Sequence, residues 1–398
     1  GRCKPAVRQD AGLGAVEVAG ILPSVLRAAL RAVTSWRSTF CQNIVRKAEE
    51  TMTATVQRQA RAHVPDKAWL ARQAREDILE PDLPIVDPHH HLWQHANHRY
   101  LLDELLADTG SGHNITATVY IDCRSMYRAD GPVAMKPIGE TEFANGVAAM
   151  SVSGIYGQTR ACAGIVSYVD MTLGARTRAV LEAHVTAGNG RFCGIRHAGG
   201  WDSSPDVRNS HTNPPQGLYG QANYREGVAQ LGALGLTYEA WQYHPQLKQV
   251  TALASAVPQT MMILNHCGGP LGIGPYAGKA DAVFATWKAD LQELARCPNV
   301  VVKLGGLGMD IGPFVAHIQR PAPPSSAEIA AAWKPWIETC IEVFGPDRCM
   351  FESNFPVDKL STGYAVLWNA FKRLAAGASA TEKTALFSGT AKRVYKLT

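Results

Sequence analysis

Three consecutive histidines end an apolar run near residue 90. The run reads LPIVDPHHHLW from Leu83 to Trp93, and its histidines are His89, His90 and His91. In a β-strand, residues two apart share a face, so His89 and His91 point the same way while His90 points away. Two adjacent imidazoles can transfer protons or bind a metal ion. The spacing therefore predicts a site that contains His89 and His91.

Polar residues also end apolar runs further along the chain. Arg196 ends GIR, His266 lies in MMILNHCGGP, Lys303 lies in VVVKLGG, and CMFESNFPVD contains Glu352 and Asn354. In an apolar core, each of these charged groups would need its own buried partner. A single site at the ends of several strands explains the pattern more simply, and clustered ionisable groups are typical of such sites.

The elements that must position these residues can be predicted from periodicity. Eight apolar runs predict strands, namely PIVDPHHH, ITATVYIDC, CAGIVSYVD, FCGIRH, GLTYEAW, MMILNHC, NVVVKLGG and RCMFESN. Helical periodicity follows at 177–187, 224–234, 246–256, 280–295 and 326–344, with two further helices at the C-terminus. This alternation indicates parallel strands buried on both faces. We predict an α/β protein with a (β/α)8 TIM barrel; a doubly wound sheet is the alternative, although no GxGxxG follows the first strand.

Two long segments after strands are predicted to be βα-loop insertions. They span residues 124–160 and 198–221, and in a barrel both lie at the mouth of the active site. The first contains Arg124, Tyr127 and Arg128, which are candidate substrate-binding residues together with Arg196 and Lys303. Arginine forks bind carboxylates bidentately, whereas solvated loop charges are the alternative explanation.

Charge divides the chain into two parts. Residues 1–64 contain ten Lys and Arg against four Asp and Glu, whereas residues 65–398 contain 29 against 30. The basic charge therefore belongs to an N-terminal extension, and we expect no nucleic-acid surface on the domain at 65–398. The extension contains VLRAALRAVTSWRSTF, which predicts a helix that is either a mitochondrial presequence or an ordinary amphipathic helix.

Cysteine usage and hydropathy restrict the environment of the protein. The nine cysteines are an odd number without CxxC spacing, which is typical of reduced thiols in an intracellular, most simply cytoplasmic, protein. No apolar run is long enough to span a bilayer, so we expect no membrane partner. A small-molecule substrate is the expected partner, and the subunit count stays open, a homo-oligomer included.

The ordered motifs IVDPHHHLW, GIRHAGGWD, ILNHCGGP, NVVVKLGGLGM and CMFESNFPVD resemble the amidohydrolase-related family of TIM-barrel hydrolases, which includes sugar lactonases and 2-pyrone-4,6-dicarboxylate lactonase. The resemblance covers residues 65–398. It implies catalytic or metal-binding roles for His89, His91 and His266. The family's aspartate on the last strand corresponds to Asn354, which departs from the pattern because an amide cannot act as a base.

The same strand offers a substitute for the missing acid. Glu352 stands where the family has glycine, and it shares a face with Asn354. We expect Glu352 to accept the proton or to help hold a metal, unless it is a buried structural partner of Lys303 or Arg196. The three histidines suit Zn²⁺ or Mn²⁺, but members of the family without a metal leave a metal-free site open.

The sequence thus predicts a hydrolase that opens a lactone or similar cyclic ester by attack of water on a His-polarised carbonyl. The alternatives are a metal-dependent decarboxylase on the same barrel, which would release CO₂, and a barrel that has lost catalysis and binds a ligand. Retention of the histidines and Arg196 argues against the last alternative.

Overall fold

The computed structural model describes residues 64–397. The chain divides into two units, residues 1–58 and 59–398, and the fold described here belongs to the second. The predicted N-terminal helix and its targeting role lie outside the described residues. Among residues 64–397, no helix combines the length and apolar character that a membrane span requires.

The core of the fold is a barrel of eight parallel strands in sequential order. The strands are β1 (Ile85–His90), β4 (Ile115–Ile121), β5 (Arg160–Ser167), β6 (Phe192–Arg196), β7 (Thr237–Ala240), β8 (Met262–Leu264), β9 (Val300–Leu304) and β10 (Cys349–Phe351). The barrel closes just beyond β10, where a parallel bridge joins His90 to Phe355. The predicted strands and the predicted TIM barrel are therefore confirmed.

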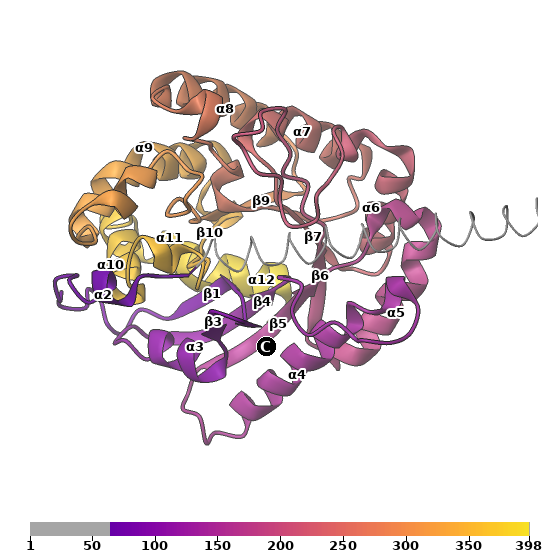
Figure 1. Cartoon of the computed structure of the whole chain (residues 1–398), viewed down its shortest axis with the longest axis horizontal. Helices are drawn as coiled ribbons and strands as arrows, with labels where there is room; N and C mark the ends of the chain where they lie inside the picture. Colours follow the sequence, from indigo (N-terminus) through magenta and orange to yellow (C-terminus); the bar gives the residue numbers. More distant parts are fainter. Residues whose placement is uncertain (1–63, 398) are drawn as a thin grey trace, which may run out of the picture. The chain divides into compact units, whose positions relative to one another are not determined.

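Helices surround this barrel (Figure 1). They are α2 (Lys67–Leu70), α3 (Leu102–Thr109), α4 (Ile138–Val152), α5 (Thr177–Gly188), α6 (Ala222–Ala233), α7 (Leu247–Ala256), α8 (Ala280–Leu294), α9 (Ser326–Phe344), α10 (Tyr364–Leu374), α11 (Ala380–Thr384) and α12 (Thr390–Tyr395). The five internal helices predicted from periodicity correspond to α5, α6, α7, α8 and α9.

The prediction of a loop insertion at residues 124–160 was wrong in part, because a helix occupies much of this segment. The segment 124–160 contains α4, which is the helix of its βα unit and packs on β5 and α5. Small residues such as Gly139, Ala144 and Ala148 lie buried on α4, so it lacks the stripe of large apolar side chains by which helices are recognised. A Cβ on Gly139 would lie 2.4 Å from the carbonyl oxygen of Met126, so the loop before α4 requires this small residue.

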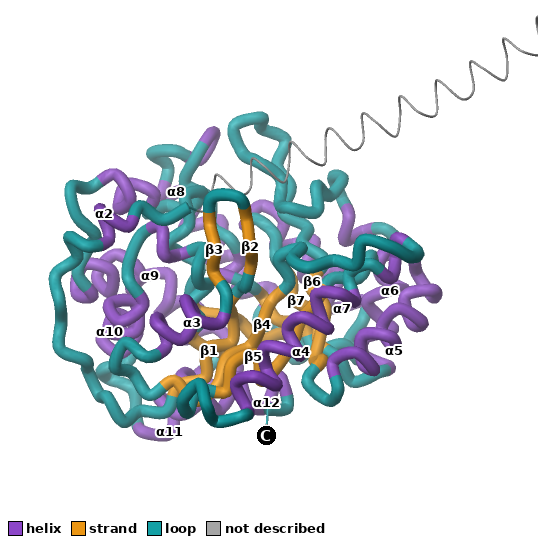
Figure 2. The backbone as a smooth tube through the Cα atoms, turned by 60° about the horizontal axis from the view of Figure 1, so that its bottom comes forward, coloured by secondary structure: helices purple, strands orange, loops and turns teal. Residues whose placement is uncertain are grey.

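A short hairpin that the sequence did not predict follows β1 at the catalytic end of the barrel. It consists of β2 (Trp93–His95) and β3 (His98–Tyr100), and α12 lies at the opposite end (Figure 2). Trp93 is buried in the hairpin and stacks on His91, with ring centroids 5.7 Å apart. The hairpin therefore covers one of the histidines that end β1.

The C-terminal helix α12 closes the other end of the barrel. Tyr395 packs in the apolar layer inside the strands, and its hydroxyl donates a hydrogen bond to Glu239 on β7. Glu239 also pairs with the buried Lys303 on β9, whose Nζ lies 2.8 Å from its carboxylate. A buried charge without a partner is costly, so this pair allows polar groups to lie directly beneath the histidines.

Candidate active site

The histidines of β1 are divided between two environments, as their spacing predicts. The Nε2 atoms of His89 and His91 lie 3.3 Å apart, whereas His90 points outward and bonds Thr118 at 2.8 Å. His91 Nδ1 lies 2.8 Å from the carbonyl oxygen of Ile121. A carbonyl can only accept a hydrogen bond, so His91 carries its proton on Nδ1 and Nε2 has a free lone pair.

Glu352 is in contact with two of the histidines. Its Oε1 accepts hydrogen bonds from Nδ1 of His266 at 2.7 Å and from the backbone N–H of His266 at 3.1 Å. Its Oε2 lies 2.7 Å from Nδ1 of His89, but the two atoms are not aligned for a hydrogen bond. The carboxylate on its Nδ1 side favours the Nδ1–H tautomer of His266, which leaves Nε2 of His266 unprotonated. At His89, Nη1 of Arg196 approaches Nε2, and because a guanidinium only donates, this contact favours a lone pair on Nε2 of His89.

Two cations flank His89. Arg196 Nη1 lies 3.3 Å from its Nε2, and Lys303 Nζ lies 3.3 Å from its Nδ1. All three side chains are buried. Lys303 is occupied by Glu239, and Arg196 also donates to the backbone carbonyl of Asp122. These residues are therefore placed to act on the site's electrostatics, and the substrate binding predicted for Arg196 and Lys303 stays a prediction.

The electrostatics keep the histidines neutral. Burial lowers the pKa of His89 and His266 well below the usual range, and the positive charges of Lys303 and Arg196 lower it further. The pKa of His91 is also lowered well below the usual range, mainly by burial and next by the positive charge of Arg196. Three neutral imidazoles can therefore offer lone pairs at neutral pH. Burial raises the pKa of Glu352 to about 8, although Lys303 opposes this shift by favouring the carboxylate.

These residues fit a divalent metal ion by their donor chemistry. Ligand atoms of His89, His266 and Glu352 lie within 4.8 Å of one another. His91 is not a member of this group of three, but its Nε2 lies 3.3 Å from Nε2 of His89. Two nitrogens that bind one zinc ion at about 2.0–2.1 Å in a tetrahedron are about 3.3 Å apart. His89 Nε2 has one lone pair, so an ion there would replace the hydrogen bond from Arg196.

Asn354 lies next to the histidines but is engaged elsewhere. Its side-chain amide donates to Asp358 at 2.8 Å, and its backbone N–H bonds the carbonyl oxygen of His89 at 3.0 Å. Its φ of 55° lies in the left-handed region, which asparagine tolerates better than most residues. Asn354 therefore shapes the loop after β10, and the site must find its base elsewhere.

The substrate-binding residues predicted on the loop after β4 are divided, with Arg124 and Tyr127 near Asp122 and Arg128 at the surface. Arg128 is exposed and pairs with Glu142, so the structure places it away from the site. Arg124 Nη1 donates to the backbone carbonyl of His211 at 2.6 Å. The hydroxyl of Tyr127 is buried without a hydrogen-bond partner among the described residues, and Asp122 and Arg124 act on it electrostatically. Tyr127 and Arg124 therefore remain candidates for substrate contact.

Three acidic groups that the sequence interpretation passed over support the site. Asp122 follows β4 and binds His211 and Arg196, Glu239 holds Lys303, and Asp87 accepts hydrogen bonds from Ser353. Asp122 and Glu239 each interrupt or end an apolar run, which is the pattern that identified the other residues. The same pattern therefore also identifies Asp122 and Glu239 as candidate residues of the site.

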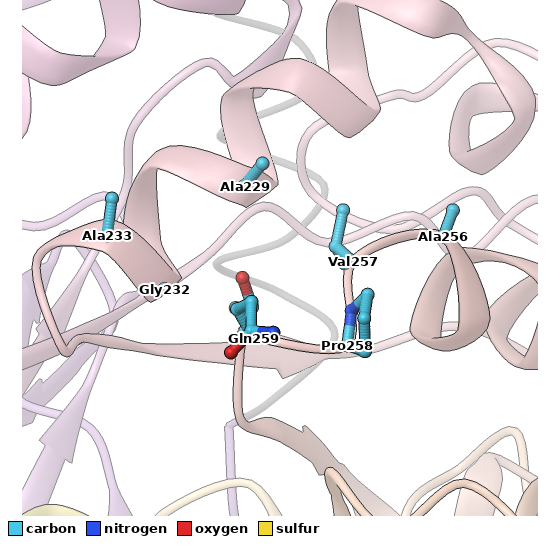
Figure 3. Close-up of a pocket in the computed structure, with 8 residues that line it drawn as sticks. Ala229, Gly232, Ala233, Ala256, Val257, Pro258 and Gln259 are labelled. Carbon is cyan, nitrogen blue, oxygen red and sulfur yellow. The ribbon is translucent and has the colours of Figure 1, made fainter.

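A pocket of about 410 Å³ lies just before β8, at the end of that strand opposite to His266 (Figure 3). It is lined by Ala229, Gly232, Ala233, Ala256, Val257, Pro258, Gln259 and Thr260. These residues belong to the ends of α6 and α7 and to the turn that precedes β8, whereas His266 follows β8. None of these residues is charged, and the hydroxyl of Thr260 is engaged by the carbonyl oxygen of Val228, so we assign no chemistry to this pocket.

Stability is expected to fall as the pH rises from about 6.5 to 8. Burial raises the pKa of Glu140, Asp358 and Glu352 to about 8, so the folded chain keeps protons that the unfolded chain has released. The buried histidines act in the opposite direction only below about pH 6.5. We expect the free energy of unfolding to drop by about 3–5 kcal/mol over this interval, measured by urea denaturation. Asp358→Asn should reduce the slope, and an unchanged slope in this variant would contradict the assignment.

Comparison with known proteins finds relatives over the barrel domain. The family model described as "Amidohydrolase" matches residues 86–397. The uncharacterized protein y4mH of Sinorhizobium fredii is 30% identical over 338 residues, which cover 79% of this chain and 99% of that protein. An L-fucono-1,5-lactonase of Burkholderia multivorans is 30% identical over 184 residues, which cover 44% of this chain and 56% of the lactonase.

A solved structure agrees with the same assignment. An amidohydrolase from Burkholderia multivorans with bound zinc superposes with a TM-score of 0.58 at 25% identity, covering 79% of this chain and 99% of that chain. Similarity therefore extends over the whole barrel, in sequence as well as in fold.

Proposed function

The chain belongs to the amidohydrolase family, and from this premise we propose that its site hydrolyses a lactone or similar cyclic ester of a small sugar-derived or carboxylated molecule. The observation that supports this most directly is the group of neutral histidines His89, His91 and His266 beside the guanidinium of Arg196. Such a group can polarise a carbonyl and stabilise negative charge on its oxygen. The similarity to a lactonase over part of the chain favours a lactone as the substrate.

The residues of the chain have separable tasks in this reaction. When bound by His89, His91 and His266, a zinc or manganese ion would polarise the carbonyl and lower the pKa of water. Arg196 supplies positive charge where the oxyanion develops, in a buried environment that strengthens the interaction. Trp93 and Trp241 cover His91 and His266, with ring centroids 5.7 and 4.6 Å away, and exclude water from their sides.

The proposal is tested with purified full-length chain and a panel of sugar lactones that includes L-fucono-1,5-lactone. Hydrolysis releases a carboxylic acid, so a pH indicator in weak buffer follows it continuously. We expect kcat/KM of about 10⁴ M⁻¹ s⁻¹ or more for the best substrate, within the common range for enzymes. Absence of turnover on every lactone would overturn the proposal. CO₂ release from carboxylated substrates would favour the decarboxylase instead.

A further inference from the structure

We propose that His211, oriented by Asp122, is the general base that activates the attacking water. This inference rests on the proposed lactone hydrolysis and concerns the same site. His211 lies in a loop after β6 that is rich in Ser, Asn and Pro, and it ends no apolar run. The structure places it against the end of β4, where it completes a carboxylate–imidazole pair.

The pair has the geometry of an oriented base. His211 Nε2 lies 2.9 Å from Oδ2 of Asp122, and the side chain of Asp122 is completely buried. A carboxylate only accepts, so Nε2–H donates and the lone pair of the ring lies on Nδ1. Among the described residues, no hydrogen bond engages Nδ1 of His211. This arrangement leaves one nitrogen of His211 available to take a proton.

Asp122 connects this pair to the histidine group. Arg196 Nε lies 3.5 Å from Oδ2 of Asp122, and Arg196 Nη1 lies 3.3 Å from Nε2 of His89. The guanidinium of Arg196 therefore separates His89 from the His211–Asp122 pair. The group that would polarise the carbonyl and the proposed base therefore border the same guanidinium, and these are the two roles that hydrolysis requires.

His211 is more accessible than the other histidines of the site. Its side chain is 17% exposed, against 0% for His89 and 3% for His266. A base must meet water and substrate, whereas a residue that binds a metal or supports the fold need not. Partial exposure therefore separates His211 from the sealed histidines.

The loop that carries His211 is attached to three other segments at the mouth. The guanidinium of Arg208 donates two hydrogen bonds to the carboxylate of Asp310, at 2.6 and 3.2 Å. Asp202 accepts a hydrogen bond from the hydroxyl of Tyr276 at 2.7 Å. The backbone carbonyl of His211 itself accepts from Arg124 at 2.6 Å. These contacts fix the loop before His211 and at His211 itself, and fixed geometry is what proton transfer requires.

The reaction needs such a base because neither residue of the β10 segment is free to act. Asn354 is an amide, and both carboxylate oxygens of Glu352 face Nδ1 of histidines. In the proposed step, a water oxygen bonds to the lactone carbonyl carbon, the C=O π bond opens to an oxyanion, and the water proton moves to Nδ1 of His211. The oxyanion then re-forms C=O, the ring C–O bond breaks, and the imidazolium returns the proton to the leaving alkoxide. Lactone and water yield one hydroxy acid.

The charges that face His211 suit a base near neutral pH. Burial lowers its pKa, Asp122 raises it, and Arg196 and Arg124 lower it. His211 is therefore unprotonated at neutral pH, and kcat should fall as the pH decreases through its pKa.

The test measures lactone hydrolysis by the full-length chain and by His211→Ala. Removal of a general base is expected to lower kcat by about 10²–10⁴-fold and to change KM little. Added imidazole should restore part of kcat, and in a series of imidazoles the rescued rate should follow the pKa of the base rather than its size. The acid limb of the pH profile should shift with the rescuing base. His317→Ala, a histidine beside Phe314 in the loop after β9, is the matched control and should keep wild-type kcat.

The outcomes separate this inference from the proposed function. Wild-type turnover with an equally active His211→Ala would overturn the base assignment and leave the lactonase intact. Lost activity without rescue, or rescue that follows size alone, would assign His211 a structural role. If the wild-type chain hydrolyses no lactone, the proposed function is overturned, and the base assignment is overturned with it. Asp122→Asn keeps the imidazole, so it should lower kcat by about 10-fold or more without rescue by added imidazole.

Discussion

Treatment with 1,10-phenanthroline is expected to abolish lactone hydrolysis, and added zinc or manganese should restore it. The reason is the donor set of the site, in which His89, His91 and His266 are buried and neutral and have Nε2 lone pairs. Mass spectrometry on protein purified without chelator should find about one ion per chain, as expected for a single site with this many ligands. The rate of lactone turnover should fall in proportion to the metal content that remains after chelation.

The matched control is 1,7-phenanthroline, which has similar size and polarity but cannot chelate. It should leave both metal content and kcat unchanged. His266→Ala provides an independent route to the same state and should reduce bound metal and lower kcat by at least about 10³-fold. A chain that contains no stoichiometric metal and keeps full activity would contradict this prediction, and the histidines would then contact the carbonyl directly.

The parts of the site that lie on strands could be predicted because strands have a fixed side-chain period. Alternation placed His89 and His91 together and His90 outside, and it placed Glu352 inside the barrel. The order of strands in a parallel barrel then brings the ends of β1, β8 and β10 to one face. Strand period and strand order are therefore sufficient to place these residues, whatever the loops do.

The contacts made by loops could not be predicted in the same way. His211 reaches Asp122 because its loop is held by Arg208 and Tyr276, and nothing in the local sequence encodes those partners. The role of Glu352 was also underdetermined, since strand alternation gives its direction but not its two histidine partners. Distances between side chains from different strands decide such roles, and they come only from the packed structure.

The charge balance of the site explains why a glutamate is tolerated at this depth. Arg196 and Lys303 bring two positive charges beside His89, and Glu239 and Asp122 each compensate one of them. In its ionised form, which a bound cation would favour over the protonated form, Glu352 therefore adds negative charge to a site that is otherwise nearly balanced. This surplus suits a divalent cation held by neutral ligands.

Glu352→Gln is expected to weaken metal binding and to lower kcat together, each by about 10–100-fold. The carboxylate faces Nδ1 of both His89 and His266, at 2.7 Å in each case, whereas an amide has only one acceptor oxygen. Its NH₂ group would oppose the second Nδ1–H and disfavour the tautomer that frees Nε2. Metal titration and steady-state kinetics on the variant measure the two effects.

The same variant distinguishes this positioning role from the general base predicted at Glu352 from the sequence. Loss of a base would lower kcat at unchanged metal affinity, and saturating metal could not restore it. Loss of a positioning carboxylate should be recovered in large part at high metal concentration, with the acid limb of the pH profile kept. Retention of that limb in Glu352→Gln, and its loss in His211→Ala, would assign proton removal to the loop after β6 and metal support to β10.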